Sequence, residues 1–314
     1  MSAKVIRTDI PVTNGDIEVV RKMLEDVKFA QSYRASGDIA ALRAATAKMV
    51  QNPFFRPVPA GVAVEPGALG GVEGEWISGP DASDDVLVFF HGGGYIRGSL
   101  DLGRANAAEI ALGSGCRVFA TAYRQAPENP FPAAVEDAVA VASALGAEGR
   151  RFALVGESAG GGLVLSTAMT LRDQGRPMPF AISCISPFVD LTLSGESWDF
   201  NAGKDIATRE MGNDMIALYM GDADRADWRA SPVFGRFDDL PPIHVIVGAS
   251  EGLFSEALSA SERAVGAGCP VTLDVFAEMP HGFTKYRFDA AGQAMARVTR
   301  WLATSAKEGE ETSA

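Results

Sequence analysis

Short apolar runs that alternate with helical segments constrain the fold of this 314-residue chain more than any other feature. Each run is apolar on both faces, which is typical of strands inside a sheet that is covered on both sides. Helices between consecutive strands favour parallel pairing. The runs are 86–90, 118–122, 152–155, 181–185, 243–247 and 271–276, and the helical segments include 132–145, 158–172, 254–266 and 289–302. The sequence therefore predicts an α/β fold with a mainly parallel sheet.

The N-terminal part of the chain departs from this alternation. Residues 1–58 are expected to be largely helical, because apolar residues recur at helical spacing over 17–27 and alanine is frequent over 39–50. A proline-rich break follows. Residues 62–64 and 72–77 are then expected to add antiparallel strands to the sheet.

A long connection in the second half of the chain is also unusual. No good strand is expected between 186 and 241, although 208–220 has helical character. Such insertions usually leave the sheet and cover a pocket. We therefore expect a catalytic domain over 59–306, in which 187–230 joins the N-terminal helices in a cap. The polar segment 307–314 is expected to be a flexible tail.

Charge and cysteine content narrow the possible partners. The net charge of −12 indicates a solvated acidic surface and argues against binding to nucleic acid or an anionic membrane. Cys116, Cys184 and Cys269 lie in or beside apolar runs, and their spacing predicts buried thiols rather than a disulfide framework or a metal site. We expect a cytoplasmic protein, since no signal-peptide pattern and no apolar stretch of about 18 residues is present.

A glycine-flanked serine points to nucleophilic catalysis. The stretch RFALVGESAGGGLVLST reads as a strand, a tight turn and a helix, and it carries Ser158 at the turn. The same G-x-S-x-G frame occurs a second time around Ser250, also after an apolar run. The pentapeptide alone therefore does not select the nucleophile.

The partners of the serine select Ser158. Serine hydrolases with a strand–turn–helix nucleophile place serine, acid and histidine in that order along the chain. Of the three histidines, His281 follows the last apolar run in a loop, whereas His244 lies within a run and His91 precedes the serine. Glu251, after the run 243–247, is then the expected acid.

A triple glycine supplies the second feature of this chemistry. The motif HGGGY over 91–95 follows a strand, and consecutive glycines expose backbone N–H groups to a ligand. Fixed N–H donors stabilise the oxyanion of acyl transfer. We expect Gly93, Gly94 and Ala159 to provide these donors. A phosphate-binding loop is disfavoured, because neither G-K-[ST] nor G-x-G-x-x-G with a ribose-binding acid is present.

Several blocks together resemble the hormone-sensitive-lipase family of α/β-hydrolases. These blocks are HGGG, GESAGG, YRQAPENPFPAAVED over 123–137, the SP and PP pairs at 231–232 and 241–242, and MPHGF over 279–283. The resemblance extends from about residue 60 to 290. It implies an α/β-hydrolase fold with a helical cap, hydrolysis of carboxylic esters, no cofactor, and a homodimer as a common assembly.

The resemblance also implies roles for single residues. Ser158 is the expected nucleophile, His281 the base and Glu251 the acid that orients it, although aspartate is usual where Glu251 stands. The expected reaction is the hydrolysis of small, uncharged, short-chain acyl esters through an acyl-enzyme. Aromatic residues that could line the pocket are Phe29, Tyr33 and Tyr95, and ordinary packing is the alternative for them.

Two other functions share these sequence features. Lactones, amides or carbamates would use the same triad, and sequence does not separate them from esters. A small-molecule receptor on the same fold is the non-enzymatic alternative, as in the plant gibberellin receptors, which resemble this family but lack the triad histidine. The presence of His281 argues against a receptor.

Overall fold

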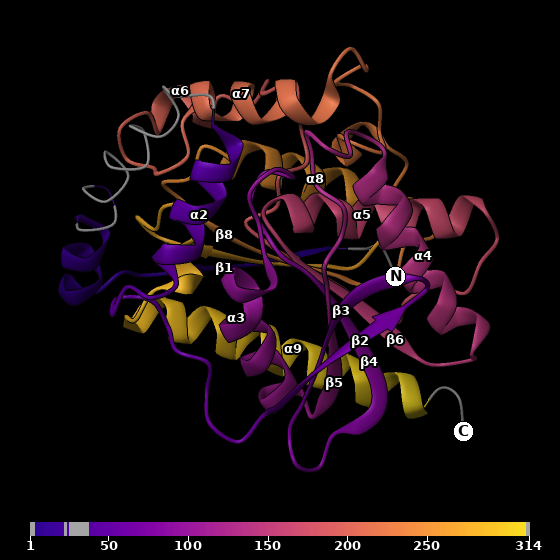
Figure 1. Ribbon diagram of the computed structural model, residues 1–314. Helices are drawn as coiled ribbons and strands as arrows, with labels where there is room; N and C mark the ends of the chain where they lie inside the picture. Colours follow the sequence, from indigo (N-terminus) through magenta and orange to yellow (C-terminus); the bar gives the residue numbers. More distant parts are fainter. Residues whose placement is uncertain (1–3, 22–23, 25–37, 312–314) are drawn as a thin grey trace.

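The computed structural model describes residues 4–21, 24 and 38–311 and is built on one nine-stranded sheet (Figure 1). The order of strands in the sheet is β1-β9-β8-β7-β6-β4-β5-β3-β2. The strands are β1 (Val5–Ile10), β2 (Ala63–Leu69), β3 (Val72–Ser78), β4 (Ser83–Phe90), β5 (Cys116–Thr121), β6 (Phe152–Glu157), β7 (Ile182–Ile185), β8 (Ile243–Gly248) and β9 (Val271–Phe276). Strands β4 to β9 coincide with the six predicted apolar runs.

Pairing within the sheet confirms the predicted mixture of directions. The strands from β5 through β4, β6, β7, β8 and β9 pair in parallel. Strand β3 pairs antiparallel with both β5 and β2 at one edge. Because the carboxyl ends of parallel strands share one edge of the sheet, the loops that follow β4, β6, β8 and β9 meet there.

Strand β1 corrects the expectation that residues 1–58 form a largely helical part of the cap. It pairs in parallel with β9 from Val5 opposite Val271 to Ile10 opposite Phe276. The sequence VIRTDI lies at the sheet edge with most of its side chains at least partly exposed, so hydrophobic patterning was too weak to reveal it. Residues 14–21 are helical, as expected, and so is α2 (Ile39–Met49).

Helices cover both faces of the sheet (Figure 1). One layer contains α3 (Leu100–Ser114) and α9 (Asp289–Glu311), and the other contains α4 (Ala133–Ala147), α5 (Ala159–Asp173) and α8 (Phe254–Gly266). The predicted helices are therefore present. Helix α9 continues to Glu311, so most of the segment expected to form a flexible tail is helical.

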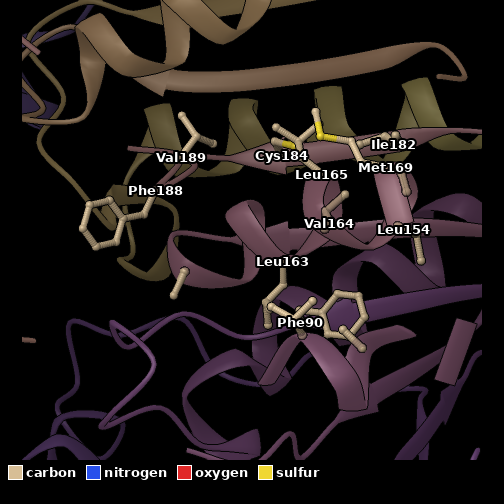
Figure 2. Packing of buried hydrophobic residues seen from close by; sticks show 14 of the residues in the cluster. Phe90, Leu154, Leu163, Val164, Leu165, Met169, Ile182, Cys184, Phe188 and Val189 are labelled. Carbon is tan, nitrogen blue, oxygen red and sulfur yellow. The ribbon is translucent and has the colours of Figure 1, made fainter. Parts of the chain in front are cut away.

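The core around α5 holds this helix against the strands (Figure 2). Leu163 packs beside Phe90 of β4, and Leu165 packs beside Cys184 of β7. These side chains are at most 2% exposed, so α5 starts at a fixed point above the sheet. The three cysteines are buried free thiols, as predicted.

The long connection after β7 contains no strand among the described residues, which agrees with the sequence prediction. It contains α6 (Ser197–Phe200), α7 (Arg209–Met220) and a short 3-10 turn at Pro232–Phe234. Helices α6 and α7 lie along one side of the molecule, away from α3 and α9 (Figure 1). None of the described helices has the length and apolar character needed to cross a membrane.

Candidate active site

The turn between β6 and α5 places Ser158 in a strained backbone conformation. Its φ is +56° and its ψ is −118°, which few side-chain-bearing residues adopt. Close packing requires the flanking glycines: a Cβ on Gly156 would lie 2.1 Å from the Gly160 carbonyl oxygen. A Cβ on Gly160 would lie 2.0 Å from that of Phe90. The G-x-S-x-G pattern is therefore a packing requirement of this turn.

Two hydrogen bonds join the three residues predicted as a catalytic set. His281 Nε2 lies 2.9 Å from Ser158 Oγ, and His281 Nδ1 lies 3.0 Å from Glu251 Oε2. In the tautomer that satisfies both contacts, Nδ1–H donates to Glu251 and Nε2 accepts from the serine hydroxyl. The three side chains come from the turn after β6 and the loops after β8 and β9.

The local contacts of Glu251 explain how glutamate serves at this position. Its side chain is fully buried, and Oε1 accepts hydrogen bonds from the Gly248 N–H and the Ser186 hydroxyl, both at 2.6 Å. Its other oxygen is then free to face His281. The backbone N–H of Glu251 donates to the Gly248 carbonyl, so the residue sits in a tight turn directly after β8.

Asp205 is a further residue of the site that sequence reasoning missed. Its Oδ1 accepts a hydrogen bond from the His281 backbone N–H and its Oδ2 accepts one from the Gly252 N–H, both at 2.7 Å. Burial raises the pKa of Asp205 to about 6. No local motif marks this residue, which lies between α6 and α7 in the long connection.

Opposing influences act on the pKa of His281. Burial disfavours the imidazolium and lowers the pKa, whereas the hydrogen bond and charge of Glu251 and the charge of Asp205 raise it. The contributions that favour the cation outweigh burial, so the pKa lies above its ordinary value of 6.5. A histidine with such a pKa is a stronger base toward a serine hydroxyl.

The glycine motif after β4 faces the same site. Gly93 has φ of +123° and Gly94 has φ of +61°, so both occupy conformations that favour glycine. Among the described residues, the N–H groups of Gly93, Gly94 and Ala159 have no hydrogen-bond acceptor. Gly93, Gly94 and Ser158 line a common cavity. The three N–H groups are thus without an acceptor in the described structure, and two of the three residues line the cavity.

The remaining histidines have structural environments, as predicted. His91 is buried, hydrogen-bonded to the Gly92 carbonyl at 2.8 Å and stacked on Tyr123. His244 is buried and lies 3.0 Å from Asp274. Neither histidine is hydrogen-bonded to Ser250 in the described structure, so no base lies beside the serine of the second G-x-S-x-G frame.

The cavity above Ser158 has a volume of about 100 Å³. Its apolar wall comes from α6, α7 and nearby loops and includes Phe188, Trp198, Met211, Met215 and Leu253. Thr46 and Met49 of α2 contribute to the lining as well. The lining of the cavity thus includes residues from both the N-terminal part and the long connection.

Of the three aromatic residues predicted to line the pocket, the structure describes only Tyr95. Tyr95 does not line the cavity: it is 2% exposed and stacks on Tyr219 with ring centroids 4.0 Å apart. The expectation for Tyr95 is therefore wrong, because the turn after the glycines directs its ring into the core. Phe29 and Tyr33 lie outside the described residues.

Comparison with known proteins identifies the family of the chain. A family model described as alpha/beta hydrolase fold matches residues 87–285. An acetyl-hydrolase of Streptomyces hygroscopicus is 33% identical over 275 residues, which cover 86% of this chain and 89% of the relative. The chain belongs to the bacterial hormone-sensitive-lipase family of α/β hydrolases and is a carboxylic ester hydrolase.

Solved structures show the same relationship. An esterase from the bacterial hormone-sensitive lipase family superimposes with a TM-score of 0.86 at 35% identity, covering 94% of this chain and 99% of the other. The structure of EstE5 soaked with p-nitrophenyl butyrate gives a TM-score of 0.81 at 32% identity, with 85% and 91% covered. The predicted fold class is thereby confirmed.

Proposed function

We propose that this ester hydrolase is a serine carboxylesterase that acts on small, short-chain acyl esters through an acyl-enzyme intermediate. The observation that carries the proposal is the continuous hydrogen-bonded path from Ser158 through His281 to Glu251. A serine hydroxyl becomes nucleophilic only when a positioned base accepts its proton. Nε2 of His281, at 2.9 Å from Oγ, is in that position.

In the first half of the reaction, Ser158 Oγ attacks the ester carbonyl while His281 Nε2 accepts the hydroxyl proton. Glu251 holds the tautomer with Nδ1–H and stabilises the imidazolium that forms. Collapse of the tetrahedral intermediate breaks the bond to the alcohol oxygen. His281 donates its proton to that oxygen, so the alcohol leaves neutral and the acyl group remains on Ser158.

The negative charge of the tetrahedral intermediate needs donors that are already in place. We assign this role to the backbone N–H groups of Gly93, Gly94 and Ala159, which have no acceptor among the described residues. Removal of a single oxyanion donor in such a site costs about 3–4 kcal/mol of transition-state stabilisation. Ala159 also begins α5, where the helix dipole favours negative charge.

Deacylation repeats the chemistry with water as the nucleophile. His281 takes a proton from water, which attacks the acyl carbonyl, and returns a proton to Ser158 Oγ as the acyl–oxygen bond breaks. The products of the complete cycle are a carboxylic acid and an alcohol.

The preference for small substrates rests on the cavity. A volume of about 100 Å³ suits a short acyl chain. We propose that α2 and the connection 187–230 act as a cap over the catalytic domain, since residues of α2 and α7 both line the cavity, whereas β1 of the same N-terminal segment belongs to the sheet. The soaking of the related EstE5 with p-nitrophenyl butyrate supports short esters as test substrates.

Two matched serine substitutions test this proposal. We expect Ser158→Ala to lower kcat for p-nitrophenyl acetate and butyrate by about 10⁴-fold or more. Ser250→Ala, in the second G-x-S-x-G frame, provides the control and should retain wild-type rates. Mass spectrometry of the quenched wild-type enzyme should show one acetyl group on the peptide that contains Ser158. Near-wild-type hydrolysis by Ser158→Ala would disprove the mechanism.

A further inference from the structure

The charged side chains of the active-site cavity are basic, although the chain carries a net charge of −12. Besides the catalytic His281, the charged residues that line the cavity in the described structure are Arg97 and Lys285. No aspartate or glutamate is among the described lining residues. The overall acidic composition therefore does not extend into the site.

Lys285 has a carboxylate partner inside the protein. Its Nζ forms an ion pair with Oε1 of Glu157, the fully buried residue that precedes the nucleophile. The charge of Lys285 is thereby balanced without a ligand, and the contact attaches the short turn after β9 to the end of β6.

Arg97 differs from Lys285 because its guanidinium forms no hydrogen bond or ion pair with the described residues, although the Tyr286 side chain is close enough to influence its charge. The residue is half-buried, and its only described hydrogen bond runs from its backbone N–H to the Gly93 carbonyl. Several half-buried arginines of the described chain donate to carboxylates, as Arg43 does to Glu128 and Arg297 does to Asp274. Arg117, which does not, lies over the Trp76 ring at 4.6 Å. Arg97 thus places a guanidinium in the cavity wall without a carboxylate partner among the described residues.

The chemistry of the guanidinium indicates which ligand group would pair with Arg97. Burial lowers the pKa of Arg97, but an arginine stays protonated at neutral pH. A partly desolvated cation is stabilised by an anion, and the planar fork of N–H donors matches the two oxygens of a carboxylate. Such a charge-assisted pair gains most where water is largely excluded.

The place of Arg97 connects this charge with the reaction. Because its backbone is hydrogen-bonded to Gly93, Arg97 is held on the loop that presents the proposed oxyanion donors. The acidic residues nearest the base, Glu251 and Asp205, are buried and do not line the cavity. A bound anion would therefore meet Arg97 within the cavity, while both carboxylates remain behind His281.

We propose that the preferred substrate is a small ester that carries one carboxylate, and that Arg97 binds this carboxylate and so determines specificity. This inference rests on the proposed esterase function and refines it. It favours a monoanionic ester over the uncharged esters expected from the sequence. The carboxylate is a spectator group: the ester bond breaks as described above, and the group itself undergoes no reaction.

Pairs of esters with matched shapes test the proposal in the wild-type enzyme. Monoethyl succinate against ethyl levulinate places the charge on the acyl half, and acetoxyacetate against acetoxyacetone places it on the alcohol half. Each kcat/KM, measured by titration of released acid, is divided by the rate of alkaline hydrolysis of the same ester. In at least one pair, we expect the anionic ester to be favoured by about tenfold or more.

Substitutions of Arg97 attribute this preference to its charge. Arg97→Met should abolish the preference for the anionic ester, and Arg97→Lys should retain part of it. Arg300→Met, which removes an exposed arginine of α9, is the control and should leave the ratio unchanged. If Arg97→Met retained the wild-type preference for the anionic ester, the proposed role of Arg97 would be refuted.

The outcomes separate this inference from the function on which it rests. If the wild type hydrolyses ethyl levulinate and acetoxyacetone in a Ser158-dependent manner but shows no preference in either pair, the esterase proposal stands and the role of Arg97 is refuted. If no ester is hydrolysed, both proposals fail. The wild-type ratios decide the matter even if an Arg97 variant does not fold.

Discussion

Asp205 and His281 are joined by a hydrogen bond from the backbone N–H of His281 to Oδ1 of Asp205, at 2.7 Å. The second oxygen of the same carboxylate accepts from the N–H of Gly252, next to Glu251. One side chain from the connection between α6 and α7 therefore holds both the loop of the base and the loop of the acid. This arrangement makes Asp205 a positioning residue of the site.

Substitution of Asp205 by asparagine should impair this positioning. Asparagine retains the shape of the side chain but offers one oxygen acceptor, so one of the two backbone N–H groups loses its partner. We expect kcat/KM for p-nitrophenyl acetate to fall about tenfold to hundredfold. Asp199→Asn, an exposed position in α6, is the control and should behave as wild type. Equal activities of both variants would contradict the role of Asp205.

Substitution of Glu251 by glutamine tests the acid of the triad. The amide would have to accept from Gly248 and Ser186 through its one oxygen, which turns its NH₂ group toward His281 Nδ1. This disfavours the tautomer that accepts the serine proton. We expect kcat to fall by about 10³–10⁴-fold in steady-state assays.

Two other buried acids serve as controls for Glu251. Glu256 contacts the Trp198 indole N–H, and Asp190 contacts Thr192 and Ser194. Neither is hydrogen-bonded to His281, so Glu256→Gln and Asp190→Asn should retain more activity than Glu251→Gln. If either proved the more damaging change in a variant that remains folded, the assignment of the acid would be wrong.

The parts of the site that could be predicted are those that follow strand ends. Ser158, Glu251 and His281 each come shortly after an apolar run, and the topology brings these loops to one edge. Asp205 could not be predicted in this way, because its contacts are with backbone N–H groups distant in sequence. Tyr95 was misplaced because adjacency to a motif does not determine the direction of a side chain.

In the fold, too, the elements marked by a local sequence pattern were predictable, and those that depend on tertiary contacts were not. The buried strands were predictable because both of their faces are apolar, whereas β1 was missed because its place depends on backbone pairing with the edge of β9. The charge of Arg97 was visible in the sequence, but its lack of a carboxylate partner was not. The absence of a carboxylate near Arg97 can be recognised only from the three-dimensional positions of the residues around the cavity.

The pH dependence of activity should report the environment of His281. The base must be neutral to accept the serine proton, and its pKa is raised above 6.5. We therefore expect kcat/KM to fall as the pH decreases, with a midpoint above pH 6.5. Because the negative charge of Asp205 helps raise this pKa, Asp205→Asn should move the midpoint to lower pH. An unchanged midpoint would show that Asp205 acts through geometry alone.

Two glycine substitutions test whether the nucleophile turn depends on close packing. A Cβ at Gly160 would lie 2.0 Å from the Phe90 carbonyl oxygen, so Gly160→Ala should lower the free energy of unfolding by about 3 kcal/mol or more. Gly292, in the first turns of α9, has no heavy atom within 4 Å of the corresponding position. Gly292→Ala should therefore raise the free energy of unfolding by about 0.5–1 kcal/mol. Denaturant titration measures both values, and a Gly160→Ala protein as stable as wild type would show that α5 can move away from β4.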